Sequence, residues 1–146
     1  MIINNRKIYF VKYDTELDWT KDLPKLNWLC ILINNDCDKK YLVEAISKVI
    51  NNDVSFICSI GRSSEATQIL IDEELVFRDV DIENLYLPSH IIKTTWNSNY
   101  DEGIRFSIFG ACHEEVEIDK VVVLDMSKGE ETDRIFQILS EYQLTG

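Results

Sequence analysis

Continuous apolar runs alternate along this chain with segments in which apolar residues recur every three or four positions. The continuous runs lie at 28–33, 54–60, 91–96 and 121–125, and a shorter one spans 8–11. Runs of this length without a polar face are typical of strands that are buried on both faces, as in parallel sheets. The pattern therefore predicts about five strands, of which 121–125 is the clearest.

Helical spacing separates these runs. The polar stretch 34–36 is a helix-start signal, and the apolar residues at positions 42, 45, 46 and 49 then share one helical face. A second helix is expected from about Tyr100 to Cys112. A terminal helix is expected after Ser127 and Glu130, which have the spacing of a capping box. Residues 65–87 predict no more than a short helix near position 66.

Strands that alternate with amphipathic helices indicate an α/β fold. We expect a single three-layer α/β/α domain over 1–146, with a mainly parallel sheet of about five strands, Rossmann-like or flavodoxin-like. Only two prolines and five glycines occur, and no linker divides the chain. In such folds the carboxyl ends of the strands converge on one edge, where ligands usually bind.

The polar residues that follow the predicted strands are expected at this carboxyl edge. The segment Lys93–Phe106 stands out, because Trp, Asn, Ser, Tyr and two acids gather where an apolar run meets a helix. Trp96 either stacks on a ligand or packs the sheet edge, and packing is favoured. The candidate ligand-binding residues are Asn35, Asp36, Arg62, Ser63, Trp96, Asn97, Tyr100, Asp101, Glu102, Asp125, Ser127 and Lys128.

No catalytic or metal-binding pattern is present. His90 and His113 are the only histidines, so no metal or other cofactor is expected. No G-x-S-x-G elbow or Walker loop occurs, and Ser63 or Ser64 is expected to cap the next helix. Cys37, near a helix start, could have a lowered pKa, but no base is identifiable beside it. Enzymatic activity is left open, with a non-enzyme favoured.

The charge is unevenly distributed. Residues 1–62 carry nine Lys/Arg and eight Asp/Glu, and residues 63–146 carry six and eighteen, so the net charge of −11 lies in the second half. This balance disfavours nucleic acid and anionic membranes, and favours a basic protein partner. We find no membrane-length apolar run, no signal peptide and no C-x-x-C pair among four cysteines, which predicts a cytoplasmic protein.

Two functional hypotheses follow. The first is a non-enzymatic protein-binding module, of the immunity or antitoxin type, that inhibits a basic partner. The second is a small-molecule or nucleotide-binding protein, or an enzyme, with its site at the carboxyl edge. A third reading, a homo-oligomer without chemistry, would pair copies through 8–11 as an edge strand.

The segment Thr94–Asn97, with Asp101-Glu102 after it and Phe106 in the following helix, resembles an uncharacterised bacterial family known only as a domain of unknown function. The resemblance covers roughly 54–126. It departs at Asn97, where a histidine is expected, and at Ile60, where a tryptophan is expected. The resemblance implies the fold and the candidate edge, and it adds no chemistry.

Overall fold

The computed structural model describes residues 1–80 and 85–145. One six-stranded sheet runs through it in the order β1-β2-β6-β3-β4-β5. Neighbouring strands are parallel except for β1, which is antiparallel to β2. The strands are β1 Ile2–Ile3, β2 Arg6–Val11, β3 Trp28–Ile33, β4 Phe56–Ile60, β5 Lys93–Asn97 and β6 Lys120–Asp125. The predicted α/β class with a mainly parallel sheet is therefore confirmed.

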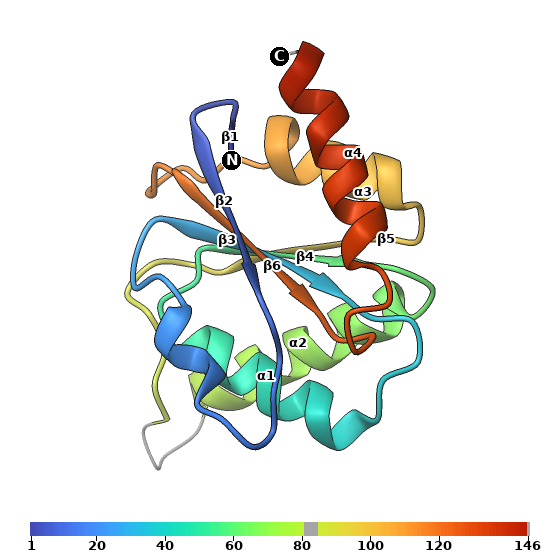
Figure 1. The fold of residues 1–146 in the computed structure, drawn as a ribbon. Coiled ribbons are helices and arrows are strands. Elements are labelled where there is room, and N and C mark those ends of the chain that lie inside the picture. The colour runs from blue at the N-terminus through green and yellow to red at the C-terminus, as the bar shows by residue number, and fades with distance from the viewer. Residues whose placement is uncertain (81–84, 146) are drawn as a thin grey trace.

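Helices cover both faces of this sheet, which makes three layers (Figure 1). One face carries α1 and α2, together with the short 3-10 helix η1; the other carries α3, the π-helix η2 and α4. Their bounds are η1 Trp19–Asp22, α1 Lys39–Asn51, α2 Ser64–Val80, α3 Tyr100–Arg105, η2 Phe106–Gly110 and α4 Thr132–Thr145. None of the described helices is long and apolar enough to cross a bilayer.

The central strands are apolar throughout because both of their faces are covered. Every residue of β3 is buried, and its side chains alternate between two core clusters. Ile31 packs with Ile104 on the α3–α4 side, whereas Leu32 packs with Ile46 on the α1–α2 side. This alternation explains why the sequence shows continuous runs instead of a period of two.

Most of the segment 65–87, for which the sequence predicted no more than a short helix, belongs to the long helix α2. Residues 81–84 of that segment lie outside the described part of the chain. The inner face of α2 is partly polar, which hides its periodicity. Arg78 is only 6% exposed, although it is charged. Its guanidinium donates to Glu74 at 2.8 Å and Asn51 at 2.7 Å, and also to Ser47 and the Tyr86 carbonyl. These bonds tie the end of α2 to α1.

The helix expected over 100–112 changes form halfway. After α3 the chain widens into η2, where the N–H of Ala111 donates to the carbonyl of Phe106 at 2.7 Å. The guanidinium of Arg6 is buried against the end of η2 and donates to the carbonyls of Ser107 and Ala111. Cys112, given above as the approximate end of this helix, lies beyond it and is exposed.

The predicted capping box before the last helix is also wrong. The helix α4 begins at Thr132, and Ser127 and Glu130 instead form a turn in which the Glu130 N–H donates to the Ser127 carbonyl at 3.3 Å. The side chain of Asp125 takes over the role of the cap, as described below.

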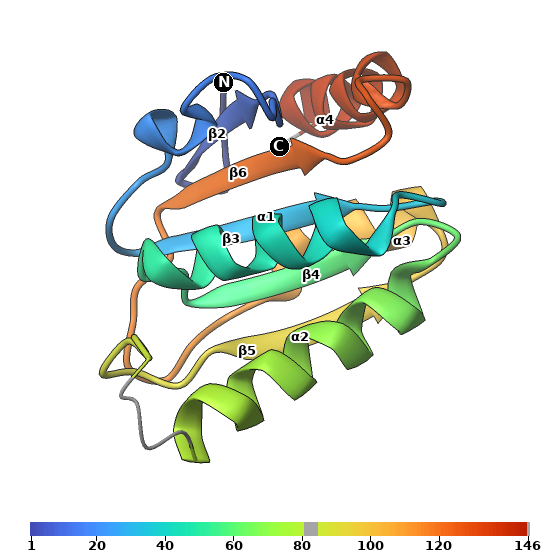
Figure 2. The same ribbon diagram turned by 90° about the horizontal axis from the view of Figure 1, so that it is seen from below.

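The order of the strands creates one switch point at the carboxyl edge. From β3 the chain moves outward to β4 and β5 with α1 and α2 on one face, and it returns to β6 over the other face (Figures 1 and 2). The connections after the neighbouring strands β3 and β6 therefore leave toward opposite faces, which is where crevices form in such sheets. β2 lies second from the edge, and β1 pairs only with its residues Arg6 and Lys7.

Candidate functional site

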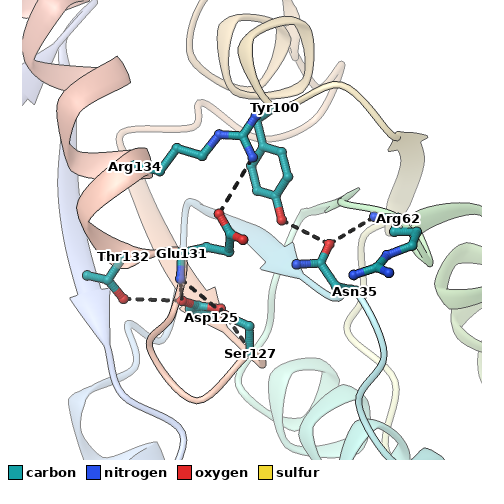
Figure 3. Close-up of polar contacts among 8 residues, drawn as sticks. All are labelled: Asn35, Arg62, Tyr100, Asp125, Ser127, Glu131, Thr132 and Arg134. Atoms are coloured by element: carbon teal, nitrogen blue, oxygen red, sulfur yellow. Dashed lines mark hydrogen bonds and ion pairs between the residues drawn. The ribbon is translucent and has the colours of Figure 1, made fainter.

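Asn35 joins three loops at the carboxyl edge (Figure 3). Its side-chain oxygen accepts hydrogen bonds from the Tyr100 hydroxyl and from the backbone N–H of Arg62, both at 3.0 Å. Its backbone carbonyl accepts a further bond from the Ser63 hydroxyl. The β3–α1, β4–α2 and β5–α3 connections are thereby fastened to one residue.

Asp125 organises the turn between β6 and α4 in the same way. One carboxylate oxygen accepts from the N–H of Ser127 at 2.8 Å and from its hydroxyl, and the other accepts from the N–H of Glu131 at 3.1 Å and the hydroxyl of Thr132 at 3.2 Å. These four bonds satisfy a carboxylate that is almost buried. A carboxylate in this position also stabilises the positive end of α4.

Arg134 closes the edge between these two junctions. Its guanidinium lies 4.0 Å from the centre of the Tyr100 ring, and it pairs with Glu131 at 3.6 Å (Figure 3). Burial raises the pKa of Tyr100, so its hydroxyl stays protonated and can donate to Asn35. Six predicted site residues thus form two hydrogen-bonded groups, in which Arg62 takes part only through its backbone N–H. Asn35 joins Arg62, Ser63 and Tyr100, and Asp125 joins Ser127.

The other predicted site residues point elsewhere. Asp101 and Glu102 are exposed on the first turn of α3, which Asn99 caps by accepting from the Glu102 N–H at 2.9 Å. Asn97 accepts from the N–H of Asn99 at 2.8 Å and so shapes the same turn. Asp36 and Lys128 are exposed on their loops.

Trp96 lies at the sheet edge, where it is covered only in part. Its side chain is 45% exposed on β5, the outermost strand (Figure 2).

Ser63 and Cys37 also differ from expectation. Ser63 precedes α2, but its hydroxyl bonds to Asn35 instead of capping the helix, and the buried Ser64 hydroxyl has no partner among the described residues. Cys37 precedes the cap residue of α1 and is not in its first turn. Burial raises the pKa of its thiol, and Asp38 and Asp36 raise it further, although Lys128 opposes them. The thiol is therefore protonated at neutral pH.

Sequence reasoning missed a cavity that lies beside the predicted residues. A space of about 430 Å³ opens between the loop after β2, the start of α1 and the turn after β6. It is lined by Lys12, Tyr13, Asp14, Thr15, Cys37, Tyr41, Asp125, Met126 and Lys128. Only Asp125 and Lys128 were predicted, because the loop after β2 carries no local motif that marks it.

The outer edge of β5 is the second open feature. The N–H of Lys93 donates to the Ser55 carbonyl at 3.1 Å, so the backbone N–H and C=O groups of alternate residues of β5 point toward β4. The backbone groups of Thr94 and Trp96 therefore point away from the sheet. The Thr94 carbonyl accepts from the Gln68 amide at 3.2 Å. The N–H of Thr94 and both backbone groups of Trp96 have no hydrogen-bond partner in the described part of the chain.

A small cavity and acidic helices flank this edge. The cavity, of about 250 Å³, lies between β4, β5 and α3, and Trp96, Gly103 and Phe106 are among its lining residues. The flanking helices α2, α3 and η2 carry seven acids against two arginines, a net charge of −5. The acids are Glu65, Asp72, Glu73, Glu74, Asp79, Asp101 and Glu102.

Among the described residues, no three His, Cys, Asp or Glu side chains lie together where they could hold a metal ion. No curated protein and no solved structure matches the chain. A family model described as "Domain of unknown function (DUF7684)" matches residues 8–142. This match agrees with the resemblance drawn from the Thr94–Asn97 segment and covers more of the chain. The protein therefore belongs to the DUF7684 family.

Proposed function

We propose that this protein is a non-enzymatic binding module that takes a basic, extended segment of a partner protein onto β5, as an inhibitor of the immunity or antitoxin type would. The observation that carries the proposal is the open edge of β5, where three backbone groups lack partners beside an exposed Trp96. A peptide that adds a strand to such an edge gains backbone hydrogen bonds, and pockets beside the edge select its side chains.

The structure offers one such pocket and one exposed aromatic residue beside the edge. Trp96 lies on the same sheet face as Ile57, which α2 covers, and the small cavity opens on the α3 side next to Phe106. Alternate side chains of an added strand would thus meet Trp96 and the cavity in turn. The hydroxyl of Thr94 donates to Asp72 at 2.8 Å, which makes the first part of the docking edge polar.

Charge selects the kind of partner. The net charge of −5 on the flanking helices attracts a segment that is rich in lysine and arginine, and it speeds the encounter at low salt. The same charge opposes a second copy of this chain at β5, because two acidic surfaces would face each other. We place this binding in the reducing cytoplasm of a bacterium, in keeping with four free cysteines.

The experiment compares matched variants of the tagged protein in lysate of the native host at low salt. Trp96→Pro removes an outward N–H without breaking the ladder to β4, and Trp96→Thr removes the ring but keeps that N–H. We expect a basic protein to be retained by the wild type, weakened by Trp96→Thr and lost with Trp96→Pro. Glu16→Lys, a charge change on an exposed residue of the loop between β2 and β3, serves as the control.

The captured protein is then purified, and its association rate is measured as salt is raised. The proposal requires a rate that falls steeply with salt and falls further when Glu73 and Glu102 are changed to lysine. Retention of the same proteins by the wild type and by Trp96→Pro would refute the docking strand. A rate that does not depend on salt would refute the electrostatic selection.

A further inference from the structure

The 430 Å³ cavity lies at the switch point of the sheet, next to the ends of β2 and β6, whereas β5 is at the far edge of the sheet. It is bounded by the loop after β2, the start of α1 and the turn after β6, and these connections diverge to opposite faces. Its volume falls within the roughly 300–1,000 Å³ of small-molecule sites. Six of its nine lining residues lie in 1–62, where the net charge is +1, whereas residues 63–146 have a net charge of −12.

Aromatic rings form one wall of the cavity. Tyr13 lies in the middle, with its ring centre 5.3 Å from that of Trp19 and 6.4 Å from that of Tyr41. The hydroxyl of Tyr13 donates to the carboxylate of Glu44, so the ring is held at both ends. A wall of fixed rings suits a flat ring system, because stacked or edge-to-face contacts need no reordering.

Two lysines reach this cavity from separate loops. Lys12 and Lys128 line both this cavity and the adjoining space of about 350 Å³ toward Phe10. Neither side chain has a hydrogen bond or an ion pair to a described residue. Of the two acids in the lining, Asp125 accepts four bonds from its own turn, and Asp14 accepts from the Glu16 N–H at 2.8 Å.

We propose that this cavity binds a nucleoside monophosphate or an equally small phosphate ester of a flat ring. The ring lies against Tyr13 and Tyr41, and the phosphate lies between Lys12 and Lys128. The ammonium groups supply charge-assisted hydrogen bonds to the phosphate oxygens, and the aromatic wall removes the ring from water. The thiol of Cys37 lines the same space as a small apolar group.

Calorimetric titration tests the proposal with AMP, GMP, CMP, UMP and FMN, and with adenosine and inorganic phosphate as fragments. We expect at least one of the five phosphate esters to bind with a Kd of about 10–100 µM, and each fragment to bind at least about tenfold more weakly. The Lys12→Met, Lys128→Met double variant is expected to weaken binding by a further factor of about ten or more. Lys25→Met, on the loop before β3, is the matched control.

Thiol labelling places the ligand independently. In a Cys112→Ser background the part-buried Cys37 is the accessible thiol, because Cys30 and Cys58 are buried. The bound nucleotide is expected to slow alkylation of Cys37 several-fold. Unfolding by urea shows that the exposed lysine variants are still folded, so that a loss of binding reports on the site.

Three results would overturn the proposal. They are the absence of binding by all five esters at millimolar concentration, binding that is unchanged in the double lysine variant, and phosphate alone that binds as tightly as the nucleotide. The proposal is independent of the docking strand on β5, because Trp96→Pro is expected to leave nucleotide binding unchanged.

Discussion

Replacing Gly103 by alanine sets two effects of known size against each other. Gly103 lies within α3, where alanine favours the helix by about 0.8–1 kcal/mol over glycine. A Cβ at this position would meet Cγ1 and Cδ1 of Ile60 at 2.8 and 2.9 Å and Cβ of Asn97 at 3.3 Å. Ile60 is buried in β4, and its side chain can move away from a new Cβ only by turning into the small cavity that it lines together with Gly103.

The steric term is expected to win. Overpacking of a core costs about 1–3 kcal/mol, so the net change after the helix gain is a destabilisation of about 1 kcal/mol. For a domain of this size that change lowers Tm by roughly 2–4 °C. Urea unfolding followed by tryptophan fluorescence measures the free energy of unfolding directly.

Gly110→Ala is the matched control. Its Cβ would meet ring carbons of Phe106 at 2.8 and 3.2 Å, but Phe106 is exposed and its ring can move away. We expect this variant to lie within about 0.5 kcal/mol of the wild type. If Gly103→Ala is as stable as the wild type or more stable, the reasoning that α3 is pressed against β4 at this point is refuted.

Three further changes test the edge and the core. Asn35→Ala is expected to cost about 1–2 kcal/mol in urea unfolding, since two hydrogen bonds are lost, and an equal loss in Asn35→Asp, which keeps the acceptor, would contradict this account. Arg78→Met is expected to cost about 3–5 kcal/mol because it leaves buried polar partners unpaired, and a loss below about 1 kcal/mol would contradict a buried clamp. Burial and the bond to Glu44 raise the pKa of Tyr13. The unfolded chain therefore loses this proton at lower pH than the native state, so stability falls as pH rises above about 10, and Tyr13→Phe should make that fall shallower in unfolding curves measured at several pH values.

The strands were predictable because burial on both faces leaves a direct trace in the sequence. The runs at 28–33 and 121–125 became β3 and β6 almost residue for residue. Helix α2 was not predictable to its full length, since Arg78 stands on its inner face and is satisfied by partners from α1 that no local pattern reveals. The π-helix η2 depends on Arg6, about a hundred residues away, and was equally hidden.

The sequence predicted where the candidate edge lies, but not what its residues do there. Residues that follow parallel strands do meet there, as Asn35, Arg62 and Tyr100 show. The sequence could not reveal that these groups bond to one another, because that depends on distances between loops. The order of the strands was hidden for the same reason. It brings the loop after β2 to β6 and so creates the cavity around Tyr13.

The single residue Asn35 has a thermodynamic consequence. Its loop contributes Cys37 to the cavity wall, while its side chain holds the starts of α2 and α3, the helices that flank β5. A ligand that shifts this loop must alter the position of both helices, and a strand docked on β5 must in turn alter the loop. If both sites bind, linkage requires that each ligand change the affinity of the other by the same factor. Loss of the Asn35 side chain should uncouple them.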